Sequence, residues 1–192
     1  MAPMDIELPP LVKEAQVVAD LAGFTLSCEP DVGGLLAALA AAVPPGGRIL
    51  ELGTGAGVGL AWLEHGLRDR RDVEIVSVDI DPEIQGAASR IDWPIAVRFE
   101  LGDGAEVVGG LGQFALIFAD APGGKIFKLR RTINALAPGG VLVVDDMDLT
   151  QHEDPDLRAG LAIARERLLS NEDLVCSELG YSSGVIIAVK RR

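Results

Sequence analysis

The chain has 192 residues, of which 48% are hydrophobic and 24% are charged, the composition of one folded domain. Its 29 acidic and 17 basic residues give a net charge of -12. This charge argues against unaided binding to nucleic acid or to an anionic membrane, because both favour a basic surface. The longest apolar run, Leu35–Val43, is too short to span a bilayer. Cys28 and Cys176 form neither a disulfide framework nor a zinc-binding spacing, so we expect a cytoplasmic protein.

Short β-type runs alternate with helical patterns along the chain, which is typical of a parallel sheet covered by helices. Two helices are expected first, over 10–22 and 31–43, as an N-terminal arm of residues 1–45. Strands are predicted at 48–52, 73–78, 95–101, 114–119 and 141–144, with helices from about 58, 81, 103 and 125 between them. A helix from Asp154-Pro155 precedes two strands, near 174–178 and 185–190, that we expect to pair antiparallel. The sequence therefore predicts one α/β domain over 1–192, with a doubly wound, mostly parallel seven-stranded sheet, helices on both faces and the last strand antiparallel.

Three glycines follow the first predicted strand, in the segment Glu51-Leu-Gly-Thr-Gly-Ala-Gly57. Glycine has no Cβ, so the backbone can turn tightly and approach a ligand, and the following helix presents free N–H groups to it. The spacing differs from the dinucleotide fingerprint, whose last glycine would fall at Val58. The acid Glu51 before the first glycine favours a ligand with cationic or hydroxyl groups over a pyrophosphate.

Two acids stand where the second and third strands end. Asp79 follows the second strand, where a carboxylate can accept hydrogen bonds from both hydroxyls of a ribose. Asp103 follows the third strand, where it can cap a short helix and also flank an adenine.

Taken together, Glu51–Gly57, Asp79, Gly102-Asp103-Gly104 and Leu136–Gly140 resemble a class I S-adenosylmethionine-dependent methyltransferase. The segments Phe114–Ala121 and Gly140–Asp146 narrow the resemblance to the catechol and caffeoyl-CoA O-methyltransferases and their bacterial relatives. It covers about Glu29 to Arg192 and implies a Rossmann-like fold with S-adenosylmethionine as cofactor. The residues expected to bind this cofactor are Glu51, Gly53, Thr54, Gly55, Gly57, Asp79, Ile80, Asp103, Gly104, Ala105 and Asp120.

The resemblance also implies a divalent cation, held by the residues that match the family's ligands, Asp120, Asp145 and Asp146. Carboxylate oxygens suit Mg²⁺, the expected ion, and also Mn²⁺ or Ca²⁺. Such an ion would chelate two adjacent substrate oxygens and lower the pKa of one hydroxyl. The alternative is that these acids face water without a metal.

Three departures from the family pattern bear on the reaction. In the family, the lysine that acts as general base usually stands in the segment Asp-Ala-Asp-Lys. This chain has Asp120-Ala-Pro-Gly-Gly-Lys125 instead. Asp146 replaces a common asparagine, and Val58-Gly59 replaces the usual Tyr-Ser. Lys125 and His152 are therefore both candidates for the catalytic base.

The leading prediction is a metal-assisted O-methyltransferase that acts on a hydroxylated small molecule. We expect a homodimer, because its relatives are dimers and the helix at 31–43 carries more apolar side chains than one contact stripe needs: Leu35, Leu36, Leu39 and Val43. Three alternatives stay open: a cofactor-binding protein without catalysis, a tRNA hydroxyl methyltransferase, and an aminopropyltransferase. The net charge disfavours the tRNA enzyme. The chain lacks room for the N-terminal β-domain of the aminopropyltransferases.

Overall fold

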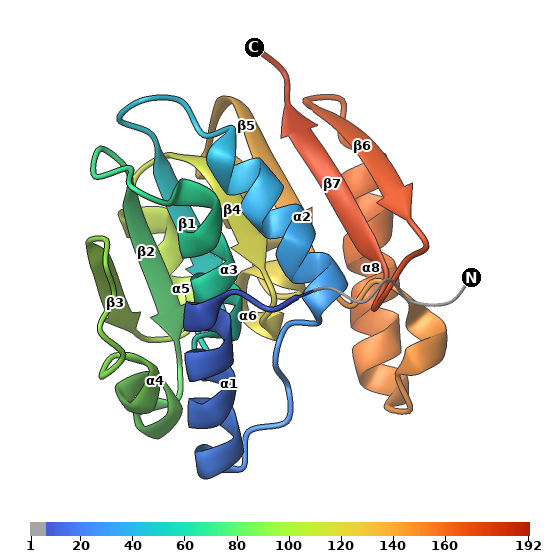
Figure 1. Ribbon diagram of the computed structural model, residues 1–192. Coiled ribbons are helices and arrows are strands. Elements are labelled where there is room, and N and C mark those ends of the chain that lie inside the picture. The colour runs from blue at the N-terminus through green and yellow to red at the C-terminus, as the bar shows by residue number, and fades with distance from the viewer. Residues whose placement is uncertain (1–6) are drawn as a thin grey trace.

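The computed structural model describes residues 7–192, and its centre is a single seven-stranded sheet (Figure 1). The strands are β1 (Arg48–Leu52), β2 (Glu74–Asp79), β3 (Val97–Leu101), β4 (Phe114–Ala119), β5 (Leu136–Val144), β6 (Leu174–Leu179) and β7 (Val185–Lys190). Their order is β3-β2-β1-β4-β5-β7-β6. The pairs among β1 to β5 are parallel, and β7 runs antiparallel to both β5 and β6. The predicted fold class is thereby confirmed.

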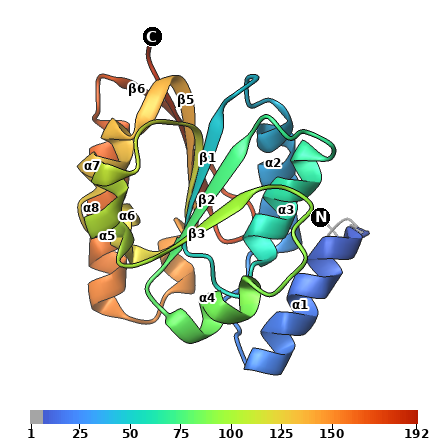
Figure 2. The same cartoon turned by 90° about the vertical axis from the view of Figure 1, so that its left-hand side faces the viewer.

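Helices cover both faces of this sheet (Figure 2). They are α1 (Pro10–Ala22), α2 (Pro30–Ala41), α3 (Val58–Leu67), α4 (Pro82–Ala88), α5 (Gly104–Val107), α6 (Pro122–Lys125), α7 (Leu129–Asn134) and α8 (Pro155–Leu169), with 3-10 turns η1 (Val108–Gly110) and η2 (Leu149–Gln151). Ile49 of β1 joins the core beneath α1, α2 and α3, and its neighbour Leu50 joins the core beneath α7 and α8. Because both faces are covered, the central strands are almost entirely apolar.

The predicted N-terminal arm packs onto the domain. Val12 of α1 and Leu36 of α2 are fully buried in the same core as Ile49. Residues 1–6 of the arm lie outside the described part of the chain. The division of the chain into an arm and a domain stays a prediction, but the two helices behave as part of one core.

Aspartate side chains cap three of the helices, among them Asp103 as predicted. Asp81 Oδ1 accepts from Glu83 N at 2.8 Å, and Asp103 Oδ1 accepts from Ala105 N at 2.8 Å. Asp154 Oδ1 likewise accepts from Asp156 N at 2.9 Å. These short side chains satisfy backbone N–H groups that have no partner within the helix.

The segment after β4 differs from the sequence prediction. A continuous helix was expected from Lys125 to Leu136, but α6 ends at Lys125 and α7 begins at Leu129. Lys128, between them, has a left-handed backbone with φ of 56°. The strand predicted at 141–144 also begins earlier, because β5 starts at Leu136 and includes Pro138-Gly139-Gly140 as an irregularity in its pairing with β4. Gly139 makes this possible, because its φ of 78° is unfavourable for other residues.

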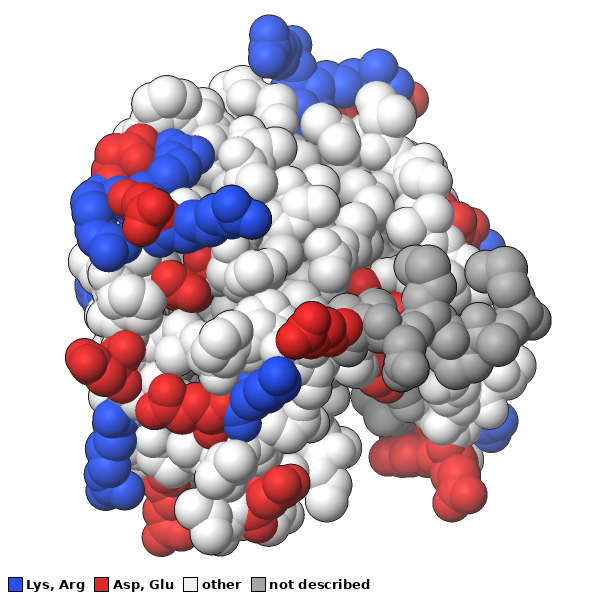
Figure 3. All heavy atoms as spheres, viewed as in Figure 1, with Lys and Arg blue, Asp and Glu red and all other residues white. Residues whose placement is uncertain are grey.

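On the face seen in Figure 3, acidic side chains are scattered among uncharged ones over the lower half, and Lys and Arg gather at the top and the upper left. Within residues 7–192, no helix combines the length and the apolar character that crossing a membrane would take.

Candidate active site

The glycine loop joins β1 to α3 at the point where the strand order changes direction. Gly53 N and Thr54 N both donate to the carbonyl of Val78, at 2.8 and 3.1 Å, which ties the loop to the end of β2. Gly53 has φ of 105°, and a Cβ there would lie 3.1 Å from the backbone oxygen of Asp120. The glycine therefore permits a close approach of the ends of β1 and β4. Gly57 is the residue immediately before α3, and it packs against Trp93. It does not line either of the cavities described next.

Asp79 ends β2 and lies between two cavities of about 160 and 140 Å³, both of which it lines. Its Oδ2 accepts from Gly55 N at 2.7 Å, and its Oδ1 accepts from Asp81 N at 2.9 Å. Each carboxylate oxygen has a further lone pair. The backbone thus holds the carboxylate in place and leaves it able to accept from a ligand.

The two cavities account for most of the predicted cofactor-binding residues. The first is lined by the glycine loop, including Thr54 and Gly55, and by Asp120. The second is lined by Ile80, Asp103 and Gly104. Ala105 is buried and outside both linings; its N–H serves the Asp103 cap.

The loop between α1 and α2 also lines the first cavity, through Phe24, Leu26, Ser27 and Cys28. Ser27 Oγ is buried there and has no hydrogen-bond partner within the described chain. A buried hydroxyl without a protein partner needs one from a bound water or a ligand. Sequence reasoning missed this segment, because no motif marks a loop that reaches the site through tertiary packing.

Glu51 does not line either cavity, which differs from its predicted role as a cofactor-binding residue. Its side chain is fully buried and accepts from Ser77 Oγ at 2.5 Å. Ser77 Oγ is also 2.7 Å from Thr54 Oγ1, which accepts from Gln85 Nε2 at 3.2 Å. Burial raises the pKa of Glu51 to about 8, in spite of the Ser77 hydrogen bond. Glu51 is thus the end of a buried chain of polar groups that supports the glycine loop.

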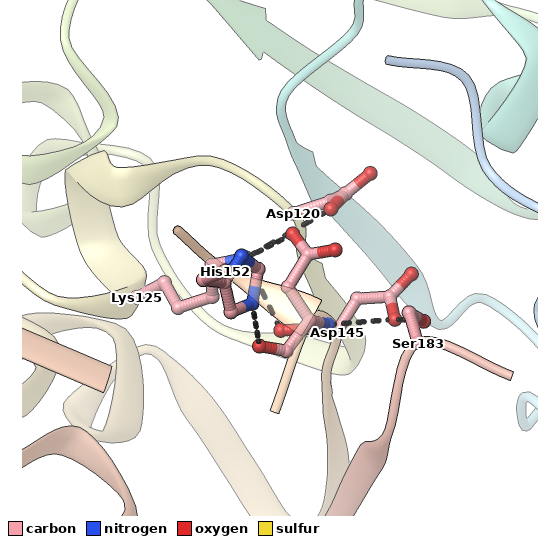
Figure 4. A network of polar contacts seen from close by, with 6 residues as sticks. Asp120, Lys125, Asp145, His152 and Ser183 are labelled. Carbon is pink, nitrogen blue, oxygen red and sulfur yellow. Dashed lines mark hydrogen bonds and ion pairs between the residues drawn. The ribbon is translucent and has the colours of Figure 1, made fainter. Parts of the chain in front are cut away.

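A cluster of acids surrounds one lysine beside the first cavity (Figure 4). The side chain of Lys125 is 3% exposed, and its Nζ donates to Asp146 Oδ2 at 2.7 Å and to the backbone oxygen of Asp145 at 3.1 Å. Asp120 Oδ1 lies 3.9 Å from the same nitrogen. The structure therefore brings together all four residues that sequence analysis selected from the ends of β4 and β5.

Two glycines bring Lys125 back to the strand ends. Gly123 and Gly124 leave the helical conformation, and Gly124 has φ of 92°. Thr132 Oγ1 of α7 holds the turn by donating to the carbonyl of Gly124 at 2.7 Å. The two additional residues that separate Lys125 from Asp120 in the sequence are thus taken up by a tight turn, and the ammonium still lies beside the carboxylate.

The carboxyl group of Asp145 is directed away from this ammonium (Figure 4). It accepts from the hydroxyl of Ser183 and from Asp146 N at 2.8 Å. Burial raises its pKa to about 6, although these hydrogen bonds act in the opposite direction. Asp145 was predicted to be a metal ligand, but it places its backbone oxygen, not its carboxylate, next to the centre of the cluster.

The electrostatics of the other two acids are set by burial and by Lys125. Burial, together with the carboxylates of Asp145 and Asp146, raises the pKa of Asp120 well above its usual range. Burial acts in the same direction on Asp146, but the charge and hydrogen bond of Lys125 outweigh it, and the pKa of Asp146 is lowered. Asp146 also has a left-handed backbone with φ of 61°, which Asp and Asn tolerate better than other side chains do.

The donor set does not fit the predicted divalent cation. Among residues 7–192, no group of three or more His, Cys, Asp or Glu side chains is arranged to hold a metal ion. Of the three predicted carboxylates, only those of Asp120 and Asp146 face the centre of the cluster, and the ammonium of Lys125 lies beside both.

His152 follows η2 and lies beside the cluster (Figure 4). Its Nε2 is 2.8 Å from the backbone oxygen of Asp146. Because a carbonyl oxygen only accepts, Nε2 carries the proton in this contact. In the neutral ring, Nδ1 is then the nitrogen with a free lone pair.

Comparison with known proteins defines first a class and then a family. The O-methyltransferase TomG of Streptomyces achromogenes, solved with S-adenosylmethionine, superposes with a TM-score of 0.83 at 22% identity, over 98% of this chain and 93% of TomG. A Staphylococcus aureus protein described as a caffeoyl-CoA O-methyltransferase superposes with a TM-score of 0.73 at 16% identity, over 93% of this chain and 91% of that one. The fold is thus that of the Rossmann-like methyltransferases.

Sequence similarity identifies the family. A model of a methyltransferase domain matches residues 50–147. A Mycobacterium tuberculosis protein named as an O-methyltransferase is 34% identical over 174 residues, which cover 84% of this chain and 76% of the relative. The chain belongs to the O-methyltransferases of this methyltransferase domain family.

Proposed function

We propose that this protein transfers a methyl group from S-adenosylmethionine to a hydroxyl group of a small molecule. The observation that carries the proposal is Asp79, held by two backbone N–H groups between two cavities, one of which reaches the cluster around Lys125. When bound, S-adenosylmethionine supplies an electrophilic methyl group with a neutral thioether as the leaving group. The chain itself has to bind this cofactor, orient the acceptor and take up a proton.

The two cavities would divide the cofactor between them. Asp79 would accept from the ribose hydroxyls. Ile80 and Asp103 would flank the adenine in the second cavity. The glycine loop and the unpartnered Ser27 Oγ would meet the polar methionine end in the first. Asp120 lines that cavity too and would lie near the point of transfer.

The transfer requires an acceptor oxygen placed in line with the methyl group. A bond forms between this oxygen and the methyl carbon while the carbon–sulfur bond breaks, and its electron pair stays on sulfur. The proton of the acceptor hydroxyl goes to His152 Nδ1. Lys125 is less suited to this task, because an ammonium that donates to Asp146 and Asp145 has no lone pair to offer.

A methyl-transfer screen tests the proposal. Vicinal diphenols, hydroxycinnamoyl thioesters and hydroxylated tRNA would be incubated with S-adenosylmethionine, and formation of S-adenosylhomocysteine and of the methylated acceptor would be measured by mass spectrometry. We expect turnover on a small hydroxylated acceptor and none on tRNA. The proposal would be contradicted if the protein did not bind S-adenosylmethionine, or if it methylated tRNA and no small molecule.

His152 provides a sharper test of the proton transfer. We expect His152→Ala to lower kcat by a factor on the order of 10² or more while leaving cofactor affinity unchanged. The matched control is His65→Ala, which alters the exposed histidine of α3. Equal kcat values in the two variants would remove His152 as the base.

A further inference from the structure

The centre of the acid cluster is occupied by a group of the chain itself. An ammonium has three N–H donors, and three oxygen atoms surround that of Lys125: Asp146 Oδ2 at 2.7 Å, the Asp145 carbonyl at 3.1 Å and Asp120 Oδ1 at 3.9 Å. These are oxygens of the same three residues that were expected to bind a divalent cation. Lys125 reaches them from inside the protein, with a side chain that is 3% exposed.

A divalent cation would have to displace the Lys125 ammonium from these oxygens. Mg²⁺ can complete its shell of about six oxygen ligands with water, so the protein groups at the centre of the cluster decide whether it binds. The carboxylate of Asp145 is held by Ser183 and by the backbone N–H of Asp146, so turning it inward would break both hydrogen bonds. The cation would also have to lie next to a buried positive charge, and repulsion between like charges is strong in a poorly solvated site.

We propose that the Lys125 ammonium takes the place of the divalent cation, so that this O-methyltransferase works without a metal. This inference rests on the proposed function and names the buried positive charge that stands behind the acids of the site. The charge of one ammonium favours a developing oxyanion, as a metal would, but as a point charge with hydrogen-bond donors it does not chelate two oxygens. The enzyme should therefore accept a phenol or alcohol with a single hydroxyl as well as a vicinal diol.

The first experiment measures cation binding by the parent protein. Mn²⁺ would be titrated into the full chain and followed by electron paramagnetic resonance, and thermal unfolding would be compared in Mg²⁺, Mn²⁺, Ca²⁺ and EDTA. We expect no saturable Mn²⁺ site, no shift of the unfolding midpoint and the same turnover in EDTA. One bound Mn²⁺ per chain, or loss of turnover in EDTA that Mg²⁺ restores, would overturn the proposal.

The second experiment removes the ammonium. Lys125→Met nearly keeps the length of the side chain but leaves Asp120 and Asp146 without a counter-charge, and we expect it to gain a saturable Mn²⁺ site that the parent lacks. The matched control is Lys128→Met, which alters a lysine of the same segment that pairs with Glu106 on the surface. It should bind Mn²⁺ no better than the parent.

If Lys125→Met does not fold, Lys125→Met with Asp146→Asn reduces the repulsion between the remaining acids and is measured in its place. A variant that folds and gains no Mn²⁺ affinity would show that Lys125 is not what excludes the cation, and the proposal would fail. These binding measurements do not depend on turnover. If the acceptor screen detects no methyl transfer, the proposed function is wrong, but the Mn²⁺ measurements still test the role of Lys125.

Discussion

At the scale of single residues, Asp79 has two roles, because it holds the glycine loop and faces both cavities. We expect Asp79→Ala to weaken S-adenosylmethionine binding by about 2–4 kcal/mol, since a charge-assisted hydrogen bond contributes about 1.5–3 kcal/mol. Asp79→Asn keeps one acceptor oxygen and should lose less. Titration calorimetry on both variants checks this, and unchanged affinity in Asp79→Ala would rule out the ribose contact.

Glu51 gives a prediction for the pH dependence of stability. Its pKa is about 8 in the folded protein and about 4.5 when exposed, so between these values the folded state holds a proton that the unfolded state has lost. Raising the pH therefore favours unfolding, by up to about 1.4 kcal/mol per pH unit for one proton. The loss of stability begins near pH 4.5 and levels off above about pH 8.

The variant Glu51→Gln isolates this effect, because its side chain is neutral at every pH. The stability of the variant relative to the parent should rise as the pH increases from 5 to 8 and stay constant above that. Urea unfolding across this range provides the measurement. Parallel pH profiles for the two proteins would mean that Glu51 is ionised in the folded state.

At the scale of elements, α2 and α3 cross so closely that their backbones nearly touch. A Cβ at Gly66 of α3 would lie 2.1 Å from the carbonyl oxygen of Ala37 in α2. The crossing positions α3, which begins at the glycine loop. We expect Gly66→Ala to force the helices apart and to lower the free energy of unfolding by about 1–3 kcal/mol.

Gly34 of α2 is the matched control for this crossing, because a Cβ there would meet nothing within 4 Å. Gly34→Ala should raise stability by about 0.5–1 kcal/mol, since alanine loses less conformational entropy in a helix than glycine does. Urea unfolding of both variants tests the pair. Similar effects in the two variants would mean that the helix crossing is not limited by Gly66.

At the scale of the whole molecule, the homodimer stays a prediction. Leu36 and Val43 are buried in the core, so they do not contribute to an outer apolar surface. Leu35 is half-buried and lines a hollow of about 420 Å³ with Leu179 and Tyr181, between α2 and the last two strands. We expect sedimentation velocity at micromolar concentration to show a dimer and Leu35→Glu to be monomeric. A monomeric parent would contradict this.

The sequence by itself determined the architecture and pointed to most of the residues that line the two cavities. Periodicity and capping are local properties, so the strands, the helix starts at Asp81 and Asp103, and the glycine loop were readable residue by residue. Parallel strands also end at one edge of the sheet, so Asp79, Asp120 and Asp145 were expected to gather there. The motifs at these strand ends were therefore sufficient to indicate the O-methyltransferase family.

Tertiary structure alone decided the chemistry of the cluster. Whether Lys125 faces solvent or Asp146 depends on the backbone angles of Gly123 and Gly124, which glycine leaves open. The orientation of the Asp145 carboxylate depends on Ser183, which lies 38 positions away in the sequence. Burial of Glu51 and the contribution of Ser27 likewise follow from which segments pack together. These details of packing distinguish a site for a metal ion from one that an ammonium fills, because the same three residues, Asp120, Asp145 and Asp146, surround the centre in either case.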